Sequence, residues 1–142
     1  LEVSRRRYQG WRDALQHYSI ANHGDMVVEC DTRLKAIVDT PHILQSDHCP
    51  DAVFCVNDDC AAGVLHAAKI LGVKIPEELS ICGFSDAPIC RATMPMLTTV
   101  QQHGAEIGKR AMTRLLIRLN GENRMPQTDM VPTDLIVRET TK

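Results

Sequence analysis

Apolar and polar positions form alternating blocks in the middle of the chain, and the pattern predicts a βαβ unit. An apolar run with β-branched residues, Ala52–Val56, stops at the polar sequence Asn57-Asp58-Asp59. A pattern of Ala and Leu at helical spacing follows over Asp58–Leu71. A second apolar run, Leu79–Phe84, stops at Ser85-Asp86. Open parallel sheets bind ligands at the carboxyl ends of their strands, so both polar stops are candidate binding positions.

The rest of the chain continues this alternation of helix and strand. Helices are predicted where apolar residues recur every three or four positions: Ser4–Tyr18, Thr32–Gln45 and His103–Asn120. Strands are predicted in short apolar runs: Met26–Glu29, Leu97–Val100 and, broken near Pro132, Met130–Arg138. Residues 87–96 are expected to be irregular. We therefore expect an α/β fold layered around a parallel sheet.

Three local details can be checked against a structure. In the first helix Tyr8, Leu15 and Tyr18 form an apolar stripe with Trp11, which we expect in the core. In the second helix the residues expected to face inward are Leu34, Ile37 and Val38. Pro41 should kink that helix or end it early, because proline lacks a backbone N–H.

Composition excludes several classes of protein. The 142 residues are 44% hydrophobic and 24% charged, with a net charge of −2, so no basic surface for nucleic acid is indicated. No apolar run approaches the ~18 residues of a membrane helix, and no signal-peptide core stands at the N-terminus. A cytoplasmic location is the default expectation. Because the chain opens directly on a helix, we expect it to be the latter part of a longer protein.

The six cysteines form no CxxC pair, and Cys55 and Cys82 lie within apolar strand runs. We expect free thiols that act as small hydrophobic side chains. A zinc site of His48, Cys49 and Cys60 stays conceivable, although the spacing fits no familiar finger and we expect no metal or cofactor. No GxSxG, P-loop or GxGxxG motif is present, and adjacent Asp58 and Asp59 point in different directions, so we expect no enzyme.

Several segments in order resemble the effector-binding domain of the lactose/galactose-repressor family of bacterial transcription regulators. The resemblance covers essentially the whole chain and rests on Arg7–Trp11, Pro50–Asp58, Ala61–Gly63, Gly72–Phe84, Pro95–Val100 with Gln102, and Leu135–Thr141. It implies a fold like that of type I periplasmic sugar-binding proteins, with two α/β subdomains and a ligand cleft between them. This chain would be a fragment that represents chiefly the C-terminal subdomain.

The resemblance also implies a division of the chain into three parts. Residues 1–97 would belong to the C-terminal effector subdomain, and residues 98–127 would form a crossover and a helix that packs on the absent N-terminal subdomain. Residues 128–142 would return to the C-terminal subdomain as terminal strands. Without its partner, the helix His103–Asn120 should dock on another copy or fold back on its own sheet.

By the resemblance, the candidate effector-binding residues are Arg7, Asn57, Ser85, Asp86 and Gln102. Arg7 matches an arginine that contacts the effector, and Gln102 matches a position that lines the cleft at the crossover. Ser85 departs from the pattern, because many sugar-responsive members carry an aspartate at that position. Asp86 cannot simply inherit the role, since a shift of one residue turns a side chain to the opposite face.

For other polar residues near these positions a structural role is the simpler expectation. Asp58 is expected to cap the helix that follows it, and His103 to begin its own helix. Thr98 and Thr99 should hold the crossover strand. Asn57 can cap a helix and contact a ligand at the same time, because its amide both donates and accepts hydrogen bonds.

We therefore expect the effector-sensing portion of a homodimeric repressor that responds to a small molecule, a sugar or sugar derivative. Operator DNA would be bound through an N-terminal helix-turn-helix absent from this chain, and no membrane would be involved. One alternative is a periplasmic sugar-binding protein for transport, against which the six cysteines argue. Another is a regulator controlled by a protein co-repressor, with an empty cleft.

Overall fold

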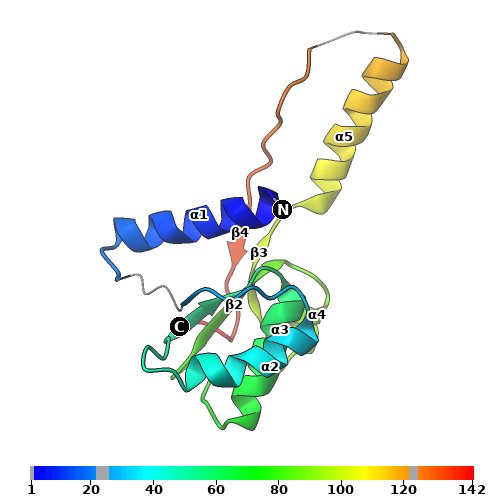
Figure 1. Cartoon of the computed structure of the whole chain (residues 1–142). Coiled ribbons are helices and arrows are strands. Elements are labelled where there is room, and N and C mark those ends of the chain that lie inside the picture. Colours follow the sequence, from blue (N-terminus) through cyan, green and yellow to red (C-terminus); the bar gives the residue numbers. More distant parts are fainter. Residues whose placement is uncertain (1, 22–25, 122–124) are drawn as a thin grey trace.

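The structure, a computed structural model, describes residues 2–21, 26–121 and 125–142 (Figure 1). Its helices are α1 (Glu2–His17), α2 (Arg33–Leu44), α3 (Asp58–Ile70), α4 (Ile89–Ala92) and α5 (Gly104–Leu119). Its strands are β1 (Ala52–Phe54), β2 (Ser80–Ser85), β3 (Thr98–Gln101) and β4 (Asp134–Ile136). In these ranges no helix is both long enough and apolar enough to cross a bilayer.

One sheet organises the fold, with the strand order β1-β2-β3-β4. The first three strands are parallel, and β4 is antiparallel to β3. The predicted α/β fold with a parallel sheet is confirmed, including the βαβ unit formed by β1, α3 and β2. The antiparallel strand follows from the route of the chain, which leaves the sheet at the end of β3 and comes back beside it.

The hydrophobic core lies between the sheet and the pair α2 and α3. The side chains of Leu79, Ile81 and Leu97 are fully buried there. The two helices approach so closely that a Cβ on Gly63 of α3 would lie 2.6 Å from the backbone oxygen of Arg33. Small residues at this crossing therefore let α3 reach the sheet while α2 covers it from outside.

A second glycine makes room for a buried carboxylate at the end of the sheet. A Cβ on Gly83 in β2 would lie 2.3 Å from Oδ1 of Asp58. Asp58 is 1% exposed, and it accepts hydrogen bonds from the Thr99 hydroxyl (2.5 Å) and the Ala87 amide (2.8 Å). One carboxylate thus joins α3, β3 and the turn after β2.

Two expectations for α2 are not met, namely an early end at Pro41 and the inward position of Leu34 and Val38. The helix passes through Pro41 and continues to Leu44, and the Thr40 hydroxyl donates to the Ala36 oxygen at 2.6 Å. A proline in the last turn removes only one helical hydrogen bond, which packing against α3 offsets. The buried residues are Ala36 and Thr40, whereas Ile37 is half-buried and Leu34 and Val38 are exposed. Close packing at Gly63 selects the small side chains for the buried face.

The strand predicted at Met26–Glu29 is absent from the structure. Val27 and Val28 are exposed and lie outside the sheet. An extended apolar segment becomes a strand only when a neighbouring strand accepts its hydrogen bonds, and β1 pairs only with β2 in the described part of the chain. Residues 87–96, expected to be irregular, contain the short helix α4.

Helix α1 forms as predicted but contributes no buried residue. Arg7, Trp11 and Leu15 are half-buried on one face, and Tyr8 stacks on Trp11 with ring centroids 5.8 Å apart. The expectation that Trp11 belongs to the core is therefore wrong. Of the predicted stripe, only Trp11 and Leu15 are half-buried, and Tyr8 and Tyr18 are exposed.

Helix α5 extends away from the sheet, with the segment that leads back to β4 beside it (Figure 1). Arg114 donates to Asp129 at 2.5 Å and 2.6 Å, which ties that segment to the helix. None of the residues of α5 is buried, and Ile107, Leu115 and Leu119 are among those exposed. The helix therefore does not fold back on its own sheet, which excludes one of the two expected arrangements.

Candidate functional site

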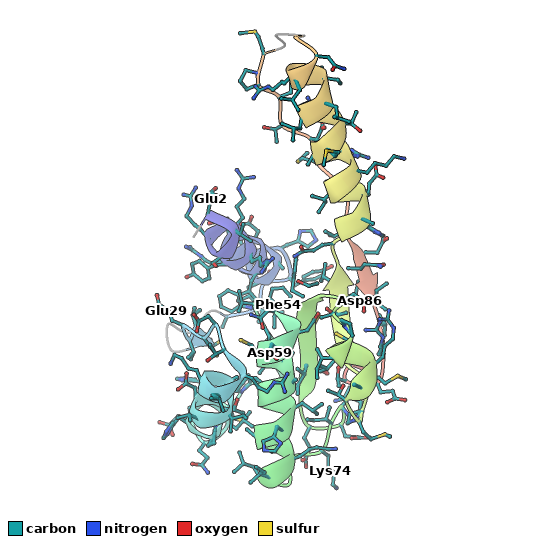
Figure 2. All side chains as sticks on the ribbon, turned by 90° about the vertical axis from the view of Figure 1, so that its right-hand side faces the viewer. Glu2, Glu29, Phe54, Asp59, Lys74 and Asp86 are labelled. Atoms are coloured by element: carbon teal, nitrogen blue, oxygen red, sulfur yellow. The ribbon has the colours of Figure 1, made fainter. Side chains whose placement is uncertain are left out.

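The carboxyl ends of the three parallel strands lie together beneath α1. Figure 2 shows Phe54 and Asp86 at this end of the sheet, with Lys74 at the opposite end. Ser85 pairs with Gln101 across β2 and β3, so Gln102 follows directly at the same level. The strand register therefore brings the predicted residues Ser85 and Gln102 to one edge, next to the start of α3.

Arg7 reaches this edge from α1. Its Nη1 donates to the backbone oxygen of Val56 at 2.6 Å. Its guanidinium carbon lies 3.9 Å from the ring centroid of Phe84, a cation–π contact. Phe84 in turn meets Phe54 edge to face, with centroids 6.2 Å apart. Burial withdraws the charge of Arg7 partly from water and so lowers its pKa.

The polar triplet after β1 points in three directions. Asn57 caps α3, with its side-chain oxygen accepting from the Cys60 amide at 2.7 Å. Asp58 points into the fold, as described above. Asp59 is exposed and forms an ion pair with Arg33. The cap is therefore Asn57, and Asp58, expected as the cap, holds the end of the sheet together.

The polar pair at the end of β2 is likewise divided between the surface and the interior. Ser85 is exposed, and both Ser85 and Asp86 have positive φ angles, 126° and 55°. The side chain of Asp86 is 5% exposed and forms ion pairs with Arg138 (2.6 Å) and Arg91 (2.7 Å). Its burial opposes ionisation, but the hydrogen bonds from the two arginines prevail and hold the pKa of this carboxyl below its ordinary value.

Arg138 is the residue that sequence reasoning missed at this place. Its Nη1 donates to the Leu97 oxygen at 2.8 Å, and its backbone amide donates to the Thr98 hydroxyl at 2.8 Å. Next to it, Thr140 exchanges hydrogen bonds with Ile81. The chain end is thus fastened across β2 and β3. No sequence pattern joins Asp86 to Arg138, because 52 positions separate them.

At the end of β3, His103 begins α5 in a left-handed conformation with φ 52°. Its Nε2 lies 2.7 Å from Oδ2 of Asp134, the first residue of β4. This contact joins the outgoing and returning connections of α5. The buried hydroxyls of Thr98 and Thr99 hydrogen-bond within the fold, in agreement with the structural role predicted for them.

All six cysteines are free thiols. Cys55, Cys60 and Cys90 are buried, Cys30 and Cys82 half-buried, and Cys49 exposed, so the expectation of buried thiols holds for only part of the set. Burial, together with the neighbouring Cys30 thiol, raises the pKa of Cys60 to about 12 and makes it a poor nucleophile. No metal-binding group of three or more His, Cys, Asp or Glu side chains exists among the described residues.

Comparison with known proteins gives a match along the whole chain. A profile of the periplasmic binding protein-like domain matches residues 1–141. The ribose operon repressor of Haemophilus influenzae is 33% identical over 138 residues, which are 96% of this chain and 42% of the repressor.

Solved structures give the same picture. A LacI-type transcription regulator from Bifidobacterium animalis is 25% identical, with a TM-score of 0.92 over 99% of this chain and 51% of that one. A LacI family regulator from Enterococcus faecium, solved with bound ribose, is 27% identical, with a TM-score of 0.83 over 95% of this chain and 50% of that one. This chain therefore spans about two fifths of the curated relative and half of each solved chain.

Proposed function

We propose that this chain, which belongs to the periplasmic binding protein-like domain family, is the effector-sensing portion of a transcriptional repressor that responds to a small molecule. The family match over residues 1–141 carries the proposal. The relatives it matches are repressors and LacI-type regulators rather than enzymes. The effector would be a sugar or a sugar derivative, as the ribose in the Enterococcus faecium regulator suggests.

The geometry of the strand ends supports an effector site at this edge. Arg7 is positioned by a hydrogen bond and an aromatic ring, and Asn57 is fixed as a helix cap. Ser85 and Gln102 stand at the same level of the sheet. Side chains held in this way can bind a ligand without a large ordering cost. They would form one wall of the site, and the rest of the complete protein would supply the other wall.

The two connections to α5 support a hinge between these walls. β3 and β4 run side by side, with Gln101 opposite Asp134, and the contact between His103 and Asp134 joins them beyond the sheet. A ligand held between two subdomains favours the closed arrangement by its differential affinity. The bound state would change the spacing of the DNA-reading heads in a dimer. Operator binding, dimer formation and a cytoplasmic location are parts of this proposal that concern the complete protein.

The exposed apolar face of α5 fits the same arrangement. Ile107, Leu115 and Leu119 are exposed on a helix that projects beyond the sheet. Apolar faces of this kind are normally covered in a complete protein. We propose that the remaining part of the protein covers this one, in agreement with the assignment of residues 98–127 to a crossover and a helix of the other subdomain.

The test uses the complete protein and operator DNA in a gel-shift assay with a series of sugars and sugar derivatives. An effector should change operator affinity, and Arg7→Gln should abolish that response while operator binding persists. Arg6→Gln is the matched control, because Arg6 is exposed on the same helix and, among the described residues, forms an ion pair only with Glu2.

Two results would contradict the proposal. One is a complete protein that binds no DNA and is exported, which would favour the transport alternative. The other is operator control that is unaffected by small molecules and requires a second protein, which would favour the co-repressor alternative.

A further inference from the structure

Arg7 carries a positive charge that has no acidic partner in the described part of the chain. Its one hydrogen bond goes to a neutral backbone oxygen, that of Val56, and the ring of Phe84 covers one of its faces. The side chain is half-buried, and burial lowers its pKa. A guanidinium withdrawn from water is stabilised best by an anion that accepts from its planar fork.

The carboxylates nearest to this edge along the chain are already engaged elsewhere. Asp58 is buried and bonded to Thr99 and Ala87. Asp59 pairs with Arg33 on the outer surface. Both carboxylate oxygens of Asp86 are occupied, one by Arg138 and the other by Arg91. None of the three aspartates that follow β1 and β2 is therefore available to balance the charge of Arg7.

Ser85 leaves this imbalance uncorrected. It is the exposed residue directly after Phe84, the residue on which Arg7 stacks, and its hydroxyl carries no charge. An aspartate at this position, which the resemblance implies for many sugar-responsive members, would add a negative charge to the edge of the sheet that Arg7 reaches. The edge consists instead of one cation with the neutral polar side chains of Asn57, Ser85 and Gln102.

We propose that the effector is anionic, a sugar derivative whose carboxylate or phosphate group pairs with Arg7. This inference rests on the proposed function and names the chemical class of its effector. Asn57 and Gln102 present amides suited to hydroxyl groups, so the polyhydroxyl part of the ligand has partners as well. The uncharged Ser85 then favours an anionic ligand, because an aspartate at this position would repel it.

The experiment measures binding to the complete protein by isothermal titration calorimetry, with each neutral sugar paired with a derivative that carries a carboxylate or a phosphate. The pairs are D-glucose with D-gluconate and D-ribose with D-ribose 5-phosphate, which also separate a carboxylate from a phosphate. In at least one pair the anionic member should bind at least tenfold more tightly. That preference should weaken as the salt concentration rises.

Two variants assign the preference to this edge. Ser85→Asp should lower the affinity for the anionic ligand at least tenfold and reduce or reverse the preference within the pair. Arg6→Gln changes the net charge by the same −1 at an exposed site of α1, so it should change the affinity less than twofold. Loss of affinity in both variants to the same extent would assign the effect to overall charge and overturn the inference.

The inference also fails if neutral ligands bind as tightly as their anionic partners, or if operator binding responds only to uncharged compounds. In either case the proposed function stands, because a small molecule still controls the protein. Conversely, a complete protein that binds no operator DNA but prefers gluconate or ribose 5-phosphate would refute the proposed function while the charge preference holds.

Discussion

The body of the molecule, formed by the sheet and helices α2, α3 and α4, differs sharply from the outer helices α1 and α5. α3 alone buries nine of its thirteen residues, whereas α1 and α5, with sixteen residues each, bury none. All three have the local features of good helices. Local sequence therefore decides where a helix forms, and the presence of a packing partner decides whether it contributes to a core.

The outer helices carry side chains that are available for contacts with other molecules. α1 brings Arg7 over the strand ends, and α5 carries an exposed apolar face away from them. The body holds the strand ends in place through buried hydrogen bonds. The buried hydrogen-bonded body and the outer helices without buried residues therefore differ in how strongly packing holds them.

The largest difference between the two regions should be in the free energy of unfolding lost when one leucine of each region is replaced by alanine. Leu79→Ala, at a position 1% exposed, should lower the free energy of unfolding of the 142-residue chain by about 3 kcal/mol. Leu119→Ala, at a position 71% exposed, should change it by less than about 0.5 kcal/mol. Urea denaturation followed by circular dichroism measures both. Equal losses would show that α5 is packed in solution and would abolish the distinction.

The second comparison concerns two arginines, one in a buried ion pair and one in an exposed ion pair. Arg138→Met leaves the buried carboxyl of Asp86 with Arg91 alone and should cost about 3 kcal/mol, the lower end of the range for a broken buried ion pair. Arg5→Met removes an exposed partner of Glu2 and should cost at most about 0.5 kcal/mol.

The double variant Asp86→Asn/Arg138→Met tests the physical reason. Removal of the uncompensated charge should recover part of the loss, as denaturation of the single and double variants would show. A double variant as unstable as the sum of its single changes would mean that Asp86 and Arg138 do not act as a pair.

Most helices and strands of both regions were predictable, because they carry strong local signals; α5 was predicted at His103–Asn120 and spans Gly104–Leu119. The apolar runs before Asn57 and Ser85 and the helical spacing between them predict β1, α3 and β2 with boundaries correct to within a few residues. Met26–Glu29 carried the same kind of signal and forms no strand. Its hydrogen-bonding partner is a matter of tertiary context that no local pattern contains.

The candidate site was predictable only in part, and for a similar reason. The polar stops after the strands, together with the resemblance, indicate one edge of the sheet as the candidate site, and the structure brings several of the predicted residues to that edge. The fate of each polar side chain depends on contacts between distant positions, such as Asp86 with Arg138 and Asp58 with Thr99. Arg7 meets Phe84 across more than half of the chain. Spacing along the sequence cannot show such pairs.

Glycines provide a third way to compare the regions. Gly83→Ala would place a Cβ against the buried carboxylate of Asp58 and should cost about 2 kcal/mol, because neither group can move far. Gly10→Ala lies in α1 with no atom within 4 Å of the added Cβ, and it should stabilise the chain by about 0.5 kcal/mol through helix propensity. Thermal unfolding of both variants measures the effects. A neutral Gly83→Ala would show that Asp58 can leave its place in the sheet.

The comparison with the smallest expected effect concerns two carboxyl groups, each of which accepts hydrogen bonds from two arginines. Asp86 in the body accepts from Arg138 and Arg91, and Glu2 at the start of α1 accepts from Arg5 and Arg6. Hydrogen bonds from the arginines lower the pKa of both carboxyls. At Asp86 burial is the largest single influence and raises the pKa, but the two arginines together outweigh it. Salt at 1 M, where screening acts over about 3 Å, should return the pKa of exposed Glu2 toward its ordinary value and leave that of Asp86 low.

Carboxyl chemical shifts recorded by NMR against pH, at low and high salt, measure this difference. The sign of its effect on folding follows from the direction of the shift. A carboxyl whose pKa is lowered on folding stabilises the protein above its unfolded pKa of about 3.9, and the contribution is lost as pH falls through the lower folded value. High salt should therefore leave the acid sensitivity due to Asp86 in place, and Asp86→Asn should remove it. If the pKa of Asp86 rose with salt as much as that of Glu2, the ion pair between Asp86 and Arg138 would be as open to solvent as the exposed pairs of α1. The distinction between the body and the outer helix would then fail at this site.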